Sequence, residues 1–93
     1  MKTPALSQLM GAYLHQDYDA TGTIDENVDL FVRGEIELAP ALPSEVDWVL
    51  AAYRGEEELE AFVEDLGCEV LPPDDLTYRE WLTQIADRVR AAT

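Results

Sequence analysis

Apolar residues recur every three or four positions along most of the chain, the spacing that places side chains on one face of an α-helix. The pattern begins at Leu6 and Leu9 and continues to Val89. Only residues 68–71 weakly suggest a strand, because no other segment alternates apolar and polar residues. For 93 residues, this pattern predicts an all-α fold, a single-domain bundle of about five helices over residues 1–93.

Capping residues mark where the first two helices are expected to begin. Thr3 is expected to cap the first helix, with Pro4 at its first position, where a missing N–H costs nothing. Thr23 and Glu26 have the spacing of a capping box at the start of the second helix.

Helix-breaking and helix-capping residues also divide the second half of the chain into three predicted helices. Residues 39–43 interrupt the helical pattern, and Ser44 is expected to cap a third helix, with Asp47 as its reciprocal partner. A fourth helix should lie between two glycines, the second of which, Gly67, suits a left-handed C-terminal cap. Thr77 and Glu80 form another capping box, which predicts the start of the last helix.

Acidic residues are concentrated in the middle of the chain. Twenty Asp and Glu against six Lys and Arg give a formal net charge of -14. Residues 17–69 contain sixteen of these acids and two arginines, so this stretch alone accounts for the net charge. Such a field attracts basic partners and disfavours nucleic acid and anionic membranes. Solubility alone would not explain why the charge is confined to the middle.

Several classes of function are disfavoured by residues the chain lacks. One cysteine, Cys68, and one histidine cannot form an internal disulfide or a His/Cys metal cluster. His15 and Asp17 are a common pair, and no nucleophile accompanies them for acid–base chemistry. No apolar run is long enough to span a membrane, and the start does not resemble a signal peptide. We therefore expect a cytoplasmic protein, monomeric when free, that is not an enzyme and has no catalytic residues, metal or cofactor.

A calcium-binding loop is the main alternative for residues 17–25. Asp17, Asp19 and Thr21 occupy the first oxygen-ligand positions of an EF-hand, and Gly22 falls at its sharp turn. The position of the closing bidentate glutamate is occupied by Val28, and no second loop is present to pair with this one. Turn chemistry accounts for the same residues, so we disfavour a calcium site.

Clustered acids, together with one aromatic residue, are the candidates for contact with a basic partner. Glu56, Glu60 and Glu64 recur every four residues and therefore line one ridge of the fourth helix. Trp48 lies off the apolar stripe of its helix beside acids, where an aromatic side chain can anchor an interface. The complete set of candidates is Asp17, Asp19, Asp25, Trp48, Glu56, Glu57, Glu60 and Glu64.

Two short motifs at opposite ends of the chain resemble a known family. Residues 12–18, A-Y-L-H-Q-D-Y, are similar to a "Y-F-H-Q-D-W" signature, with Tyr18 where tryptophan is more usual. Residues 78–82, Y-R-E-W-L, are similar to a C-terminal "Y-R-x-W-L". Over roughly residues 6–90, the chain resembles the small acidic helical immunity proteins of bacterial contact-dependent growth inhibition systems.

The resemblance implies a helical protein that binds and neutralises the C-terminal toxin domain of a cognate effector. It also implies structural roles for four motif residues: His15 and Asp17 at the end of the first helix, and Tyr18 and Trp81 in the core. Because immunity proteins diverge with their toxins, the resemblance does not indicate the contact surface, and our prediction of that surface rests on charge alone. We expect the acidic surface to block a basic active site. The alternative is an acidic nucleic-acid mimic or adaptor that binds a basic host protein.

Overall fold

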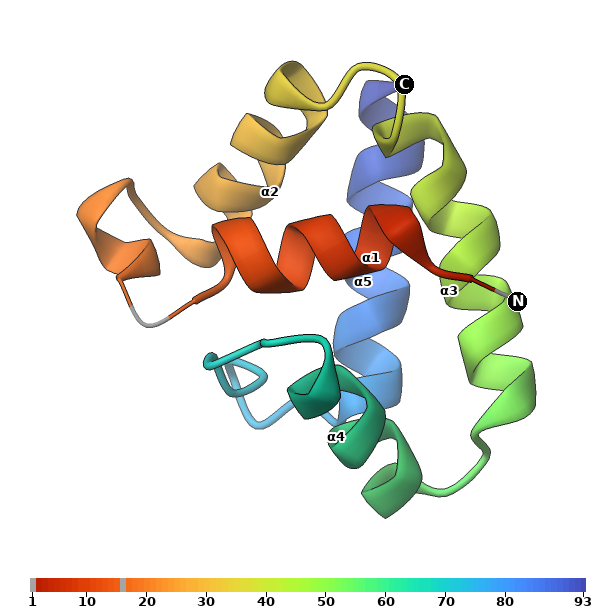
Figure 1. The fold of residues 1–93 in the computed structure, drawn as a ribbon. Helices are drawn as coiled ribbons and strands as arrows, with labels where there is room; N and C mark the ends of the chain where they lie inside the picture. Colours follow the sequence, from red (N-terminus) through yellow and green to blue (C-terminus); the bar gives the residue numbers. More distant parts are fainter. Residues whose placement is uncertain (1, 16) are drawn as a thin grey trace.

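The computed structural model describes residues 2–15 and 17–93, so Met1 and Gln16, the latter in the first motif, lie outside the described residues. Five α-helices occur within these ranges (Figure 1). They are α1 (Pro4–Gln8), α2 (Ile24–Gly34), α3 (Leu42–Ala52), α4 (Glu56–Asp65) and α5 (Tyr78–Ala92). Shorter turns are the π-helical η1 (Leu9–Tyr13) and the 3₁₀ turns η2 (Tyr18–Ala20) and η3 (Ala39–Ala41). The described residues contain no strand, residues 68–71 included, and the all-α prediction is confirmed.

Helix α5 is the centre of the packing. It contacts α2, α3 and α4, while α1 crosses it and packs against α3 (Figure 1). The predicted apolar stripes are buried between these helices, with Phe31 fully buried and Trp81 only 2% exposed. The placement of Trp81 in the core is thus confirmed, and Tyr18 packs against the core while only partly buried.

Two helices begin where local capping motifs predict. Thr23 Oγ1 accepts from the N–H of Glu26 at 3.1 Å, and the Glu26 carboxylate accepts from the N–H of Thr23 at 3.0 Å. Thr77 and Glu80 repeat this exchange at the start of α5. These bonds to the charged form, chiefly the one from the capping residue's backbone N–H, lower the pKa of both glutamates.

The predicted glycine cap also forms at the end of α4. Gly67 has φ +98°, its N–H donates to the carbonyl of Glu64, and the N–H of Cys68 donates to that of Val63. This pair of bonds is the Schellman arrangement. A Cβ on Gly67 would lie 3.4 Å from the Cα of Gly11, an ordinary contact, so it is the positive φ that favours glycine here.

Two predicted caps are wrong. The side chain of Thr3 makes no capping bond, although Pro4 does occupy the first turn of α1 as expected. Helix α3 begins at Leu42, two residues before the predicted cap Ser44, and Asp47 is simply exposed. The reason is Pro43, which needs no hydrogen-bond partner for its nitrogen and therefore fits inside the first turn.

Side chains from other helices satisfy three helix ends. The Glu45 carboxylate of α3 accepts from the N–H groups of Ala5 (3.1 Å) and Leu6 (2.9 Å) at the start of α1. The Glu56 carboxylate of α4 accepts from the N–H of Tyr78 at the start of α5. Arg79 of α5 donates through Nη2 to three carbonyls at the end of α3, those of Leu50, Tyr53 and Arg54. These bonds connect α1, α3, α4 and α5.

Candidate functional site

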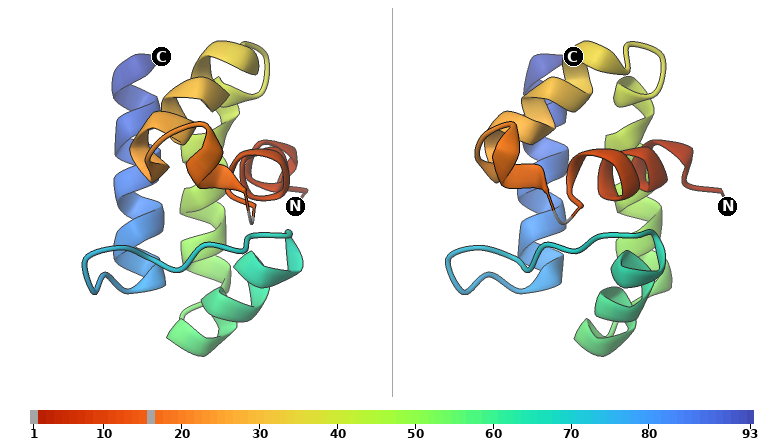
Figure 2. Two further views of the ribbon diagram at one scale, coloured as in Figure 1. Left: turned by 90° about the vertical axis from the view of Figure 1, so that its left-hand side faces the viewer. Right: turned by 60° about the vertical axis from the view of Figure 1, so that its left-hand side comes forward.

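Residues 71–77 form a loop, here called the proline loop, that crosses one face of the molecule between residues 17–26 and α4 (Figure 2, left). Its two prolines line different depressions: Pro73 lines one beside residues 18–26, and Pro72 lines one beside α4. The proline loop thus joins two concave regions into one face.

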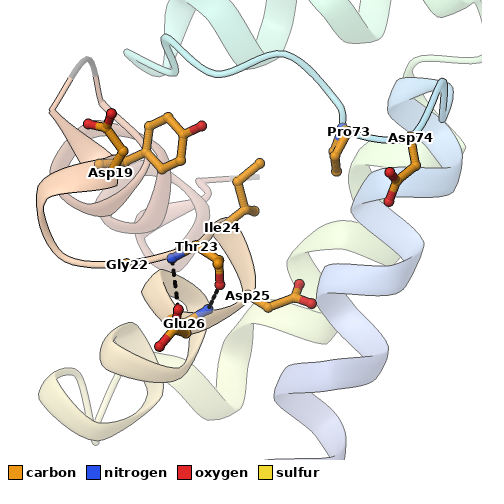
Figure 3. Close-up of a pocket in the computed structure, with 9 residues that line it drawn as sticks. Asp19, Gly22, Thr23, Ile24, Asp25, Glu26, Pro73 and Asp74 are labelled. Carbon is orange, nitrogen blue, oxygen red and sulfur yellow. Dashed lines mark hydrogen bonds between the residues drawn. The ribbon is translucent and has the colours of Figure 1, made fainter.

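The first depression, here called the Ile24 hollow, encloses about 530 Å³. Its lining residues are Tyr18, Asp19, Gly22, Thr23, Ile24, Asp25, Glu26, Pro73 and Asp74. Figure 3 shows Ile24 and Pro73 between Asp19 on one side and Asp74 on the other. The hollow therefore combines an apolar floor with an acidic rim.

A buried asparagine holds the wall that carries Asp19. Asn27 is only 1% exposed, and its amide donates to the carbonyls of Tyr18 (2.9 Å), Gly22 (3.3 Å) and Thr23 (2.8 Å). Its carbonyl oxygen accepts from the hydroxyl of Thr21. The η2 turn is therefore fixed onto α2 by one side chain. Asn27 was not among the predicted residues, and its only signal in the sequence is a polar side chain beside the apolar stripe of α2.

The opposite wall is a tight turn in the proline loop. Asp74 and Asp75 have φ values of +55° and +58°, and the N–H of Leu76 donates to the carbonyl of Pro73 at 3.0 Å. Aspartate tolerates this left-handed backbone better than most residues, although it remains less favourable there than glycine. The turn holds Asp74 at the rim of the hollow.

Arg88 of α5 fixes the outer edge of the hollow. Its guanidinium donates from Nε and Nη2 to the two carboxylate oxygens of Asp29, at 2.9 and 2.8 Å, and lies 3.7 Å from Asp25. The hydrogen bond from Arg88 lowers the pKa of Asp29. This pair joins α2 to α5 and keeps Asp25 beside a cation, unlike the other acids of the rim.

The second depression, here called the Tyr78 groove, encloses about 350 Å³ on the α4 side of the proline loop. It is lined by Glu56, Glu57, Glu60, Pro72, Leu76, Thr77 and Tyr78. Burial raises the pKa of Tyr78, and the nearby charges of Glu60, Glu64 and Glu56 raise it further. Glu56 is already engaged by the N–H of Tyr78, so it is partly structural.

Seven of the eight predicted contact residues surround the proline loop. Five line the two depressions: Asp19 and Asp25 the hollow, and Glu56, Glu57 and Glu60 the groove. Asp17 directly precedes η2, and Glu64 follows on the exposed ridge of α4. We call these seven acids the acidic face: Asp17, Asp19, Asp25, Glu56, Glu57, Glu60 and Glu64.

Trp48 lies apart from the acidic face. It is half-buried on α3, with its ring centroid 6.3 Å from that of Tyr53, which stacks on Phe62 at 4.9 Å. The structure therefore does not bring the eighth predicted residue together with the other seven.

The residues considered for other chemistry have local structural partners. His15 accepts at Nδ1 from the N–H of Asp17 at 3.0 Å, directly before η2. The thiol of Cys68 is buried and donates to the carbonyl of Val70, and burial is the main cause that raises its pKa. Within residues 2–15 and 17–93, no group of three His, Cys, Asp or Glu could hold a metal ion. No helix in those ranges is both long and apolar enough to cross a membrane.

The second sequence motif serves the framework of the fold. In residues 78–82, Tyr78, Trp81 and Leu82 are buried, Arg79 caps α3 and Glu80 completes a capping box. A family model described as CdiI immunity protein matches residues 2–89. The chain belongs to the CdiI immunity protein family. Neither the curated proteins nor the solved structures searched contain a match.

Membership of the CdiI family gives the chain an immunity role against toxins of contact-dependent growth inhibition, with a cognate toxin as partner. The family's immunity proteins are generally non-enzymatic.

Proposed function

We propose that this CdiI immunity protein binds the C-terminal toxin domain of its cognate effector and neutralises it by covering a basic active site or substrate groove with the acidic face. The observation that carries the proposal is the position of seven acids on the two segments that flank the proline loop, five of which line its two depressions although the segments lie up to nearly fifty residues apart in the sequence. On this proposal, the protein acts in the cytoplasm as a stoichiometric inhibitor and not as an enzyme.

Electrostatics supports a basic partner for this face. A surface of one sign speeds association with a surface of the opposite sign and makes the rate depend on salt. Leu71, 73% exposed, adds an apolar side chain to the proline loop beside the acids. An apolar centre with a charged rim is the usual composition of a specific interface.

Co-expression with the cognate toxin domain tests the proposal. The unaltered protein should restore growth and should be recovered in a complex with the toxin domain. Glu60→Gln with Glu64→Gln should weaken the complex and flatten its salt dependence, because both side chains are exposed on α4. Glu56 is left unaltered because its carboxylate also caps α5.

A matched control removes two charges elsewhere. Glu37→Gln with Asp47→Asn takes the same charge from exposed positions outside the acidic face, so it measures the effect of net charge alone. Equal weakening by both pairs would move the interface away from α4. No rescue and no complex would end the proposal, as would recovery of a housekeeping DNA-binding protein in place of a toxin.

A further inference from the structure

The Ile24 hollow offers a long side chain two kinds of contact. Tyr18, Ile24 and Pro73 supply apolar surface from three separate segments, and the acids stand around that surface (Figure 3). The aliphatic stems of lysine and arginine lie along apolar surface while their charged ends remain near water or anions. An entirely apolar side chain would leave the carboxylates of the rim without a partner, and an acidic one would be repelled.

The carboxylates of the rim differ in their availability. Asp25 lies 3.7 Å from Arg88, so part of its charge is already balanced. Asp19 and Asp74 are exposed and form no ion pair within residues 2–15 and 17–93. These two carboxylates stand at opposite ends of the hollow (Figure 3), so a basic side chain that lies on its apolar surface has an unpaired acid near either end.

Both walls are held in place before any partner arrives. Asn27 fixes the η2 turn that carries Asp19. The bond from Leu76 to Pro73 closes the turn that carries Asp74. Less conformational entropy is therefore lost on binding than a flexible acidic loop would lose. The Tyr78 groove is less suited to a cation because Glu56 is already occupied by the N–H of Tyr78.

We propose that the Ile24 hollow receives one long basic side chain, an arginine or lysine, from the toxin domain. The inference rests on the proposed function and adds to it a specific point of contact: the stem packs on Ile24 and Pro73, and the cationic end lies at the acidic rim, where Asp19 and Asp74 are the carboxylates without an ion pair in the described ranges. Such a side chain would act as an anchor of the interface, and the rest of the acidic face would mainly speed association.

Isothermal titration calorimetry with the purified toxin domain, at one fixed salt concentration, tests the inference. Asp19→Asn with Asp74→Asn removes both charges and keeps the side-chain shape. We expect it to raise the Kd at least about tenfold, the effect of breaking a desolvated charge pair. Glu37→Gln with Asp47→Asn removes the same net charge and should raise it less than about threefold.

Asp19→Lys is a second variant, in which the introduced cation should exclude the partner's own and weaken binding further. A thermal midpoint no lower than that of the unaltered chain would show that no variant acts through unfolding. Substitution of each arginine and lysine of the toxin domain by alanine then identifies the partner side chain. In a double-mutant cycle, one of these substitutions should make the Asp19/Asp74 change nearly silent.

The two proposals fail in different ways. If the unaltered chain does not bind the toxin domain, the proposed function is wrong, and this inference fails with it. If the chain binds and the Asp19/Asp74 variant matches its control, only this inference is wrong. It is also wrong if the variant is weaker but no arginine or lysine of the toxin domain couples to it.

Discussion

Glu45 is the buried acid among the described residues of this protein. Its side chain is 4% exposed and forms no ion pair in the described part of the chain. Both oxygens accept from N–H groups in the first turn of α1, which have no partner within their own helix. The positive end of the helix dipole also favours a negative charge there. Glu45 therefore contributes to stability by joining α3 to α1, and not to the charge of the surface.

Glu45→Ala should lower the free energy of unfolding by about 2–4 kcal/mol, because it leaves two buried donors without an acceptor. Asp47→Ala on the same helix is the control and should change it by less than about 0.5 kcal/mol, since Asp47 is exposed. Urea unfolding followed by circular dichroism measures both. Equal small effects would mean that the carboxylate does not hold α1.

The raised pKa of Tyr78 predicts how the free energy of unfolding changes at alkaline pH. Burial, and then the charges of Glu60, Glu64 and Glu56, raise its pKa in the folded state. A raised pKa stabilises the folded protein fully below the unfolded-state value, and this contribution is lost as the pH rises through the folded-state value. Tyr78 should therefore make the free energy of unfolding fall above about pH 10, and the raised pKa of the Cys68 thiol should add an earlier fall that begins at about pH 8.5. Urea titrations at several pH values measure this fall.

Tyr78→Phe should make the alkaline fall smaller because one ionising group is removed. Some fall should remain, since burial raises the pKa of Tyr13 and of Cys68 in the same direction. The same slope in Tyr78→Phe and the unaltered chain would contradict the assignment to Tyr78.

At the scale of elements, the predictable helix starts are those determined by neighbouring residues. Thr23 and Thr77 each bond to a residue three positions later, so their capping boxes could be recognised from spacing alone. The Glu45 and Glu56 contacts join residues 40 and 22 positions apart and depend on how the helices pack. Such contacts leave only an indirect signal, as with Glu45 on the core-facing stripe of Leu42, Val46 and Val49.

The candidate site also has a part that the sequence indicates and a part that forms only when the helices pack. Acids could be proposed from the sequence because charge can be counted along a chain, and five of those proposed line the two depressions, whereas Asp74 was not among them. The Ile24 hollow was not predicted, since Ile24 and Pro73 lie 49 positions apart and meet only when α2 and α5 pack. Trp48 was predicted as a contact residue because it lies off the apolar stripe of its helix. In the structure its ring lies edge-on to that of Tyr53, apart from the acidic face.

Loss of the Thr77 cap at the start of α5 should lower the free energy of unfolding more than loss of another hydroxyl on the same helix. Thr77→Ala removes the hydroxyl that accepts from Glu80 and should cost about 1 kcal/mol of unfolding free energy. Thr83→Ala on the same helix is the matched control, because its exposed hydroxyl bonds only to the carbonyl of Arg79. That change should stay within about 0.5 kcal/mol. Thermal unfolding of both variants measures the difference, and equal losses would contradict a specific role for the cap.

At the scale of the whole molecule, like charges lie close together in a small volume. The net charge is -14, and the molecule measures 30 × 24 × 20 Å. Within the described ranges, the salt bridges are those of Arg88 with Asp25 and Asp29 and of Arg90 with Asp87. Two cations thus offset few of the acids, so repulsion outweighs attraction in the electrostatic free energy of the folded state.

Salt should therefore stabilise the free protein while it weakens binding to the toxin domain. The screening length falls from about 30 Å at 0.01 M salt to about 10 Å at 0.1 M, so across this range distant acids cease to repel one another. The thermal midpoint should rise by about 5 °C, which corresponds to about 1 kcal/mol for a domain of this size. Over the same range, the association rate constant should fall, because attraction between the acidic face and a basic partner is screened in the same way. Differential scanning calorimetry and stopped-flow association measure the two effects. A midpoint that fell with salt would mean that the Arg88 and Arg90 pairs outweigh the repulsion, and an association rate independent of salt would argue against a basic surface on the toxin domain.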